Sequence, residues 1–322
     1  MLRREFIAGL GAAAVGWPIT AHPQQPERVR RIGFMRVGPP PPAFIDGFRL
    51  GMREQGFIEH QHFVIEFRLA QDTAQMDDAA AELVRRNVEV IVASGTPSVM
   101  PARNVAGRIP VVFVATLDPV ETGLVASLAK PGGNVTGMTS ISGDLIAKRL
   151  QLTKELLPKL SRIAVLVREL SPTSAQYVRE SEIASRGLGI DLQFLTEREP
   201  KDLDKILVEA KESGALVVAD DAEFTAHRVQ IAELAFGHGL PIISGLRELV
   251  EAGGLMAYGA NFGDLYRRAA GQVCKILQGA DPGNIPVEQP TKFEFVLNMR
   301  TAKTLGVTIS PTLLARADEV IE

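Results

Sequence analysis

The chain contains the same order of strands and helices twice. In the first copy an apolar run begins at Ile32, a helical pattern ends at Gly56 and another apolar run follows Pro110. Residues of the same types stand 131 positions later, since 163 − 32, 187 − 56 and 241 − 110 are equal: Ile163, Gly187 and Pro241. A duplicated α/β unit leaves a cleft between its copies, and this arrangement favours a protein that closes around a ligand.

Periodicity predicts the elements of both copies. Short β-branched runs indicate strands, and three-to-four spacing such as Phe44, Phe48 and Met52 indicates helices. The expected strands are 29–35, 63–69, 88–93 and 111–115, then 163–167, 191–195, 215–219 and 242–244. The expected helices are 43–55, 75–86, 97–106 and 119–129, then 172–186, 203–211 and 222–238. Because the strands are almost wholly apolar, we predict an α/β fold of two doubly wound parallel-sheet lobes with a ligand cleft between them.

The chain is expected to return to the first lobe near its C-terminal end. Its 322 residues are enough for two ordinary domains. After a strand at 255–258, the helix at 262–277 is assigned to the first lobe, and the tail adds a strand near 293–297 and two short helices. We therefore expect a first lobe of 29–140 plus 262–290 and a second lobe of 141–258 plus 291–322.

Residues 1–21 are typical of an export signal. Arg3 and Arg4 precede an apolar stretch rich in glycine and alanine, followed by small residues up to Ala21. The paired arginines before Glu5-Phe6-Ile7 are similar to a twin-arginine signal, although Leu2 and Ala8 depart from that pattern and the general secretory route stays open. We expect a periplasmic protein from which the signal is cleaved.

Charge and cysteine content narrow the possible partners. The formal net charge is −3, which gives no electrostatic reason to expect nucleic acid or an anionic membrane as a partner. Cys274 is the only cysteine, so we expect no intramolecular disulfide and no lipid anchor behind the signal. It falls within a predicted helix, where a free thiol usually behaves as a small core residue. The protein is expected to be a monomer.

Polar residues follow the predicted strands at the edge where open parallel sheets bind ligands. Ser94, Gly95 and Thr96 come directly after the third strand, and Gly95 would let the backbone approach a ligand. Asp118 follows the fourth strand, just before Pro119. Helix N-termini at such positions can hold a carboxylate through unpaired N–H groups. Thr96 and Asp118 are also good helix N-caps, so a purely structural role remains an alternative for both.

The second copy offers acids at the corresponding edge. Asp220 and Asp221 follow the strand 215–219 and could pair with an ammonium group, although one of them could simply cap the next helix. Tyr258 and Asn261 lie where the chain leaves the second unit, and Arg36 begins a proline-rich loop that could cover the cleft. For Tyr258, ligand contact and core packing are both open.

No pattern in the sequence calls for a cofactor or a metal. His60 and His62 have a spacing seen at metal sites but no third ligand nearby. The run from Gly9 to Ala14 has the letters of a dinucleotide fingerprint, but it lies within the signal and no strand precedes it. The chain has no G-x-S-x-G elbow and no phosphate-binding P-loop motif. We expect neither cofactor nor metal.

Several segments together resemble one family. They are Arg3 to Ile7, Asp118-Pro119, Gly123 to Val125, Pro131 to Gly137, Gly253 to Gly259 and Leu313 to Val320. The chain is similar over nearly its whole length to the ABC-transporter substrate-binding proteins of the tryptophan/tyrosine type. The resemblance implies a type I periplasmic binding fold, with two lobes joined by three crossings, and delivery of the ligand to a membrane permease.

The same resemblance implies positions for the site. Members that bind aromatic amino acids hold the carboxylate at the turn that corresponds to 94–97 and use an acid that corresponds to Asp220 or Asp221. This chain departs from the family after the first strand, where Arg36 and the proline run replace the usual loop. It also departs at 244–246, which offers no carboxylate or aromatic group.

These observations lead to one main expectation and two alternatives. We expect a non-enzymatic receptor for a small organic solute, such as an amino acid or an aromatic carboxylate, that works with an ABC permease in the inner membrane. A sensory module that hands the same ligand to a signalling receptor is the first alternative. An exported α/β enzyme that acts on a small carboxylated substrate is the second, although no nucleophile or metal set accompanies the two acids.

Overall fold

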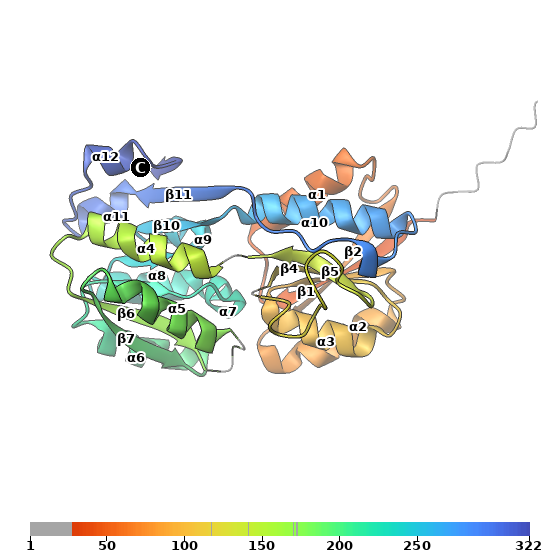
Figure 1. Ribbon diagram of the computed structural model, residues 1–322, viewed down its shortest axis with the longest axis horizontal. Coiled ribbons are helices and arrows are strands. Elements are labelled where there is room, and N and C mark those ends of the chain that lie inside the picture. Colours follow the sequence, from red (N-terminus) through yellow and green to blue (C-terminus); the bar gives the residue numbers. More distant parts are fainter. Residues whose placement is uncertain (1–27, 117, 141, 170, 172) are drawn as a thin grey trace, which may run out of the picture.

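The computed structural model describes residues 28–116, 118–140, 142–169, 171 and 173–322, with the side chains of 142–144 excepted. The export signal predicted at 1–21 lies outside the described residues. The chain forms two α/β lobes, each built on its own sheet (Figure 1). None of the helices in the described ranges is long and apolar enough to cross a bilayer.

The first sheet has five parallel strands in the order β2-β1-β3-β4-β5. The strands are β1 (Arg30–Val37), β2 (Phe63–Ala70), β3 (Val90–Ser94), β4 (Val111–Thr116) and β5 (Val135–Thr139). Figure 1 shows helices α1 and α10 on one face and α2 and α3 on the other. These helices are α1 (Pro42–Glu54), α2 (Met76–Arg85), α3 (Thr96–Ala106) and α10 (Phe262–Leu277). With both faces covered, β3 is buried along its whole length, as its apolar run from Val90 to Ala93 predicts.

The second sheet has seven strands in the order β12-β11-β10-β9-β8-β6-β7. They are β6 (Arg162–Arg168), β7 (Asp191–Glu197), β8 (Leu216–Val218), β9 (Ile242–Ser244), β10 (Met256–Ala260), β11 (Phe293–Asn298) and β12 (Glu319–Ile321). Neighbours run parallel except β10 and β11. The helices of this part are α4 (Ser142–Leu156), α5 (Ser174–Arg186), α6 (Leu203–Ala210), α7 (Ala222–Ala226), α8 (Arg228–Gly237), α9 (Arg247–Glu251), α11 (Met299–Thr304) and α12 (Pro311–Leu314).

The sequence repeat appears in the fold as a repeated strand order. β2-β1-β3-β4 in one sheet corresponds to β7-β6-β8-β9 in the other. Pro110 and Pro241 play the same part, since each carbonyl accepts the hydrogen bond that joins the third strand of its lobe to the fourth. Gly56 and Gly187 do not, because Gly56 has φ +83° whereas Gly187 has φ −77°. The repeat preserves the sheets and lets the helix ends differ.

The helix α10 belongs to the core of the first lobe, although it follows the second unit in sequence. Its buried residues Tyr266, Ala270 and Cys274 pack in one cluster with Phe34 and Phe48. The Cys274 thiol lies 3.5 Å from the sulfur of Met52, so this cysteine is a core residue.

One predicted helix is absent. The sequence predicts a helix over 119–129, but this segment consists of turns, bends and irregular backbone without a helix. Gly123 has φ +67°, and the N–H groups of Leu124 and Val125 both return to the carbonyl of Pro119. A residue in the left-handed region ends a helix after its first turn, so the segment cannot continue as an α-helix.

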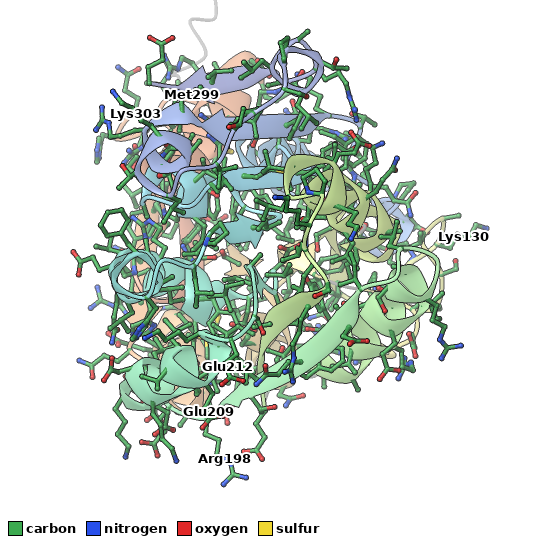
Figure 2. The ribbon with its side chains drawn as sticks, turned by 90° about the vertical axis from the view of Figure 1, so that its left-hand side faces the viewer. Lys130, Arg198, Glu209, Glu212, Met299 and Lys303 are labelled. Atoms are coloured by element: carbon green, nitrogen blue, oxygen red, sulfur yellow. The ribbon has the colours of Figure 1, made fainter. Side chains whose placement is uncertain are left out.

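Charged side chains of both signs cover the periphery. Figure 2 shows Lys130, Arg198, Glu209, Glu212 and Lys303 pointing away from the ribbon, and all five are exposed. Opposite charges are mixed here, in keeping with the small net charge.

We predict that Gly51→Ala loosens the first lobe. A Cβ at Gly51 would overlap the carbonyl oxygen of Arg267 on α10, so α1 and α10 would have to separate, and we expect a loss of about 2 kcal/mol in the free energy of unfolding. Gly271→Ala is the matched control, because this helical glycine has open space around it, and the change should stabilise by up to about 1 kcal/mol. Urea denaturation measures both. Equal effects of the two substitutions would contradict the close helix contact.

Candidate functional site

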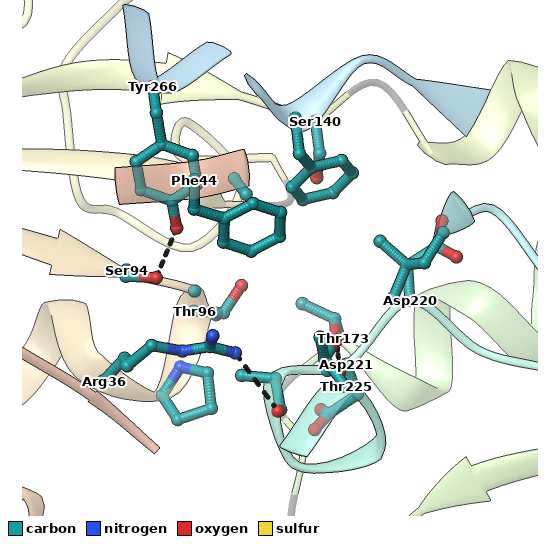
Figure 3. Close-up of a pocket in the computed structure, with 16 residues that line it drawn as sticks. Arg36, Phe44, Ser94, Thr96, Ser140, Thr173, Asp220, Asp221, Thr225 and Tyr266 are labelled. Atoms are coloured by element: carbon teal, nitrogen blue, oxygen red, sulfur yellow. Dashed lines mark hydrogen bonds between the residues drawn. The ribbon is translucent and has the colours of Figure 1, made fainter. Parts of the chain in front are cut away.

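A cavity of about 40 Å³ lies where the carboxyl ends of the two sheets face each other (Figure 3). Both lobes contribute to its walls. The lining residues are Arg36, Phe44, Ser94, Gly95, Thr96, Pro97, Ala115, Ser140, Thr173, Asp220, Asp221, Ala222, Thr225, Leu246, Phe262 and Tyr266. This is the edge at which open parallel sheets bind ligands.

The turn after β3 forms one wall. Gly95, with φ +81°, is the N-cap of α3, and Thr96 and Pro97 are the first helical residues. The expectation that Thr96 caps this helix is therefore wrong by one position, because the glycine makes the sharp turn and the threonine already lies within the helix. Ser94 ends the strand, and its hydroxyl is hydrogen-bonded to the phenol of Tyr266.

Three aromatic rings, none of them among the residues predicted for the site, form a second wall. The ring of Phe44 lies 4.7 Å from Tyr266 and 5.5 Å from Phe262, with interplanar angles of 19° and 18°. Phe44 comes from α1, and the other two rings come from the first turns of α10. Their spacing along the helices was visible in the sequence, but it is the same as the spacing of core residues. Stacked rings of this kind present flat apolar surface to a ligand.

Arg36 places a buried positive charge at the cavity. Its side chain is 1% exposed, and its guanidinium donates to the carbonyls of Pro39 at 3.2 Å and of Ala222, in the other lobe, at 3.5 Å. Its Nε has no acceptor among the described residues, and no ion pair with a carboxylate is found for it there. Burial lowers its pKa below the usual value, as expected for a charge removed from water.

The acids of the second lobe are already engaged. Asp220 accepts from the Gly245 N–H at 3.1 Å and from Arg149 at 3.0 Å, and Arg149 is itself fully buried. Asp221 caps α7 by accepting from the Glu223 N–H at 2.8 Å, and Arg168 lies 3.9 Å away. Burial raises the pKa of Asp221. Each acid therefore has an arginine of its own lobe as a partner.

A polar cluster beside Asp221 joins the two lobes. Arg168 pairs with Glu197 at 3.1 Å and with Glu223 at 2.5 Å. Thr73, which follows β2 of the first lobe, donates to the same Glu223 carboxylate through its N–H at 3.1 Å and its hydroxyl at 2.6 Å. Together with the Arg36–Ala222 hydrogen bond, these contacts hold the lobes together on one side of the cavity.

Glu248 is a buried carboxyl behind the cavity wall. It is 2% exposed and its Oε2 has no hydrogen-bond partner within the described residues. Burial raises its pKa to about 7. Its charge acts on Arg36, although Glu248 does not line the cavity.

The structure brings together six of the nine residues predicted for the site: Arg36, Ser94, Gly95, Thr96, Asp220 and Asp221. Asp118, Tyr258 and Asn261 are not among the lining residues. Asp118 is exposed and accepts from the N–H groups of Val120 and Glu121. Tyr258 packs its ring against Phe295, and Asn261 caps α10.

The described residues contain no group of three His, Cys, Asp or Glu side chains that could hold a metal ion. In particular, the Nδ1 of His62 accepts from the Ile58 N–H at 2.9 Å, so this histidine ring serves a turn.

We predict that Arg36→Met leaves the protein at least as stable as the wild type. A buried guanidinium without a carboxylate partner costs free energy, and a methionine of similar length removes that cost, so we expect a gain of up to about 2 kcal/mol. Arg103→Met, a change of the same type at an exposed position on α3, should alter stability by less than about 0.5 kcal/mol. Chemical denaturation of both variants provides the measurement. A loss of more than about 2 kcal/mol in Arg36→Met would show that this charge is compensated in the fold.

We predict that Glu248 makes the protein less stable as pH rises. Its pKa of about 7 in the folded protein lies above the ordinary 4.5, so its stabilising contribution is complete below pH 4.5 and is lost as pH rises through 7. The loss can reach about 3 kcal/mol. In Glu248→Gln, unfolding measured from pH 5 to 8 should depend less on pH, whereas the exposed Glu209→Gln should follow the wild type. Parallel curves for wild type and Glu248→Gln would rule out this assignment.

The chain is similar in sequence and in fold to proteins that are already known. A protein from Clostridioides difficile (strain R20291) that is named tyrosine-binding protein is 29% identical over 271 residues, which cover 81% of this chain and 76% of that protein. A solved ABC domain from Streptococcus pneumonia in complex with L-Trp superposes with a TM-score of 0.84 at 24% identity, covering 91% of this chain and all of that one. A conserved domain protein from Vibrio cholerae gives the same TM-score and coverage at 25% identity.

The fold is that of the type I periplasmic binding proteins. The sequence model of one family, described as ABC transporter substrate binding protein, matches residues 38–321. This match covers both lobes and all the lining residues except Arg36, which stands two positions before it. The chain belongs to the family of ABC transporter substrate-binding proteins.

Proposed function

We propose that the protein captures a small organic ligand in the cavity between its lobes and delivers it, as the periplasmic component of an ABC importer, to a permease in the inner membrane. The observation that carries this proposal is the composition of the cavity, which is enclosed by both lobes and combines hydroxyls, one buried cation and three aromatic rings. Such a cavity suits a ligand with a flat apolar part and a carboxylate.

Two observations support a ligand class: the residues that line the cavity, and the ligands named for two similar proteins. One relative is named for tyrosine and one solved structure holds L-Trp. We place an aromatic amino acid or a related aromatic carboxylate in the cavity, with Ser94, Gly95 and Thr96 near its anionic group and Phe44, Phe262 and Tyr266 against its ring. Asp220 and Asp221 line the opposite side.

Uptake requires the lobes to move. A cavity of about 40 Å³ has room for only a few water molecules, so a ligand of this class enters when the lobes are apart. In this proposal the first lobe comprises 29–140 plus 262–290 and the second 141–258 plus 291–322. The hydrogen bonds from Arg36 to Ala222 and from Thr73 to Glu223 would break on opening and form again around the ligand. The closed monomer would then be recognised by the permease.

We predict stoichiometric binding without turnover. Isothermal titration of the purified chain against aromatic amino acids and aromatic carboxylates should give one site per chain, with the added compound recovered unchanged. Trp17 is the only tryptophan and lies in the predicted signal, so calorimetry is a better readout than tryptophan fluorescence.

A cavity variant and a surface variant locate the site. Phe44→Ala removes the central ring of the stack and should weaken binding at least tenfold, which is about 1.4 kcal/mol. Phe236→Ala, at a ring that is 53% exposed on α8, should bind like the wild type. Conversion of any compound into product would favour the exported enzyme, and an absence of binding across the whole panel would remove the proposed ligand class.

A further inference from the structure

We propose that Arg36 makes the cavity selective for monoanionic ligands, so that it takes an aromatic carboxylic acid without an α-ammonium group in preference to the matching zwitterionic amino acid. This inference rests on the proposed function and narrows its ligand class. Its support is that the cation at the cavity has no carboxylate partner among the described residues, whereas the two acids there have arginine partners.

The first lobe presents a positive charge to the cavity that no carboxylate pairs with among the described residues. The Arg36 guanidinium lines the cavity, makes hydrogen bonds only to two carbonyls, and keeps its Nε–H without an acceptor in the described part of the chain. Neutral carbonyls do not offset a buried charge, whereas an anionic ligand group does. A carboxylate at this position would also receive hydrogen bonds of the strongest kind, because donor and acceptor are both charged.

Arg228 adds to the positive potential at the same place. It stands at the start of α8, donates to the Thr225 carbonyl at 2.9 Å, and its charge lowers the pKa of Arg36. The carboxyl groups that act on Arg36 in the opposite sense are Glu248 and Asp221. Neither forms an ion pair with it in the described part of the chain. Burial raises the pKa of both, that of Glu248 to about 7, so Glu248 is partly protonated near neutral pH.

The two acids that line the cavity from the second lobe, Asp220 and Asp221, each have an arginine beside them. Both oxygens of Asp220 accept hydrogen bonds, from Gly245 and from Arg149. Arg149 also donates to the Tyr177 hydroxyl and the Tyr258 carbonyl, which hold its guanidinium beside Asp220. Asp221 is committed to the N-terminus of α7 and lies beside Arg168. At either acid, an incoming ammonium would meet a carboxylate that already has an arginine beside it, so it would gain less than at an unpaired acid.

The aromatic wall adjoins this cation. The guanidinium carbon of Arg36 lies 5.6 Å from the centre of the Phe44 ring, which stacks on Tyr266. A ligand whose carboxylate reaches Arg36 therefore has its neighbouring carbons beside flat apolar surface. An aryl group joined to the carboxylate by a short apolar chain matches both features.

Matched pairs of compounds test the selectivity. Calorimetric titration would compare 3-phenylpropanoate with L-phenylalanine and indole-3-propanoate with L-tryptophan, which differ only in the α-ammonium group. We expect the acid of at least one pair to bind tenfold or more tightly than its amino acid. Equal or tighter binding of both amino acids would overturn this inference and leave the proposed function standing, whereas no binding of either kind would overturn both.

Substitutions assign the selectivity to Arg36. The wild type should prefer 3-phenylpropanoate to its neutral carboxamide, 3-phenylpropanamide, by tenfold or more, and Arg36→Met should lose that preference while it still binds the carboxamide. Arg36→Lys should keep part of the preference, and Arg103→Met, on the exposed face of α3, should keep all of it. Thermal melting of each variant confirms that it is folded. An undiminished preference in folded Arg36→Met would refute the role of this residue.

Discussion

The wall that the second lobe contributes to the cavity depends on the buried ion pair between Arg149 and Asp220. Arg149 stands on α4, which begins the second lobe, and its Nε donates to the carbonyl of Tyr258 on β10, the strand that leaves that lobe. The same guanidinium fixes Asp220 at the end of β8. One side chain thus connects elements near two of the crossings and an acid at the cavity. Removal of either partner would leave an uncompensated buried charge, which proteins tolerate poorly.

This ion pair also explains two glycines. A Cβ at Gly245 would overlap both Arg149 and Asp220, and a Cβ at Gly259 would overlap the carbonyl of Gly245. In the sequence, 244–246 is notable only for offering no charge or ring to a ligand. In the structure, the absence of side chains there is what lets the arginine reach the acid.

The features that sequence analysis predicted are those that depend on local pattern. Apolar runs and the 131-residue repeat give both sheets, and strand ends give Ser94, Gly95, Thr96, Asp220 and Asp221 at one edge. The pairing of Asp220 with Arg149 could not be predicted in this way, because 71 residues separate them and a buried arginine has no local sequence signature. The same holds for the aromatic wall, whose rings come from α1 and α10. The helix predicted at 119–129 is absent because Gly123 has a positive φ, and a helical sequence pattern does not reveal that conformation.

The buried charges of the two lobes have different kinds of partner. The second lobe pairs its acids internally, Asp220 with Arg149 and Asp221 with Arg168. The hydrogen bonds of Arg36 to described residues go to two carbonyls, one of which belongs to the other lobe. In the proposed function, the carboxylate of a bound ligand would supply the opposite charge that Arg36 lacks within the fold.

The turn at Gly95 has a mechanical consequence. A Cβ at this glycine would lie only 3.1 Å from the Cβ of Ala222, and a Cβ at Gly38 would overlap that of Ala226. The lobes therefore meet through their smallest residues, where backbone lies against methyl group and no rotamer can adjust. Because these residues cannot change rotamer, steric contact between them limits how closely the two lobes can approach. In the proposed function, a permease would therefore meet lobes whose closest approach is set by these contacts.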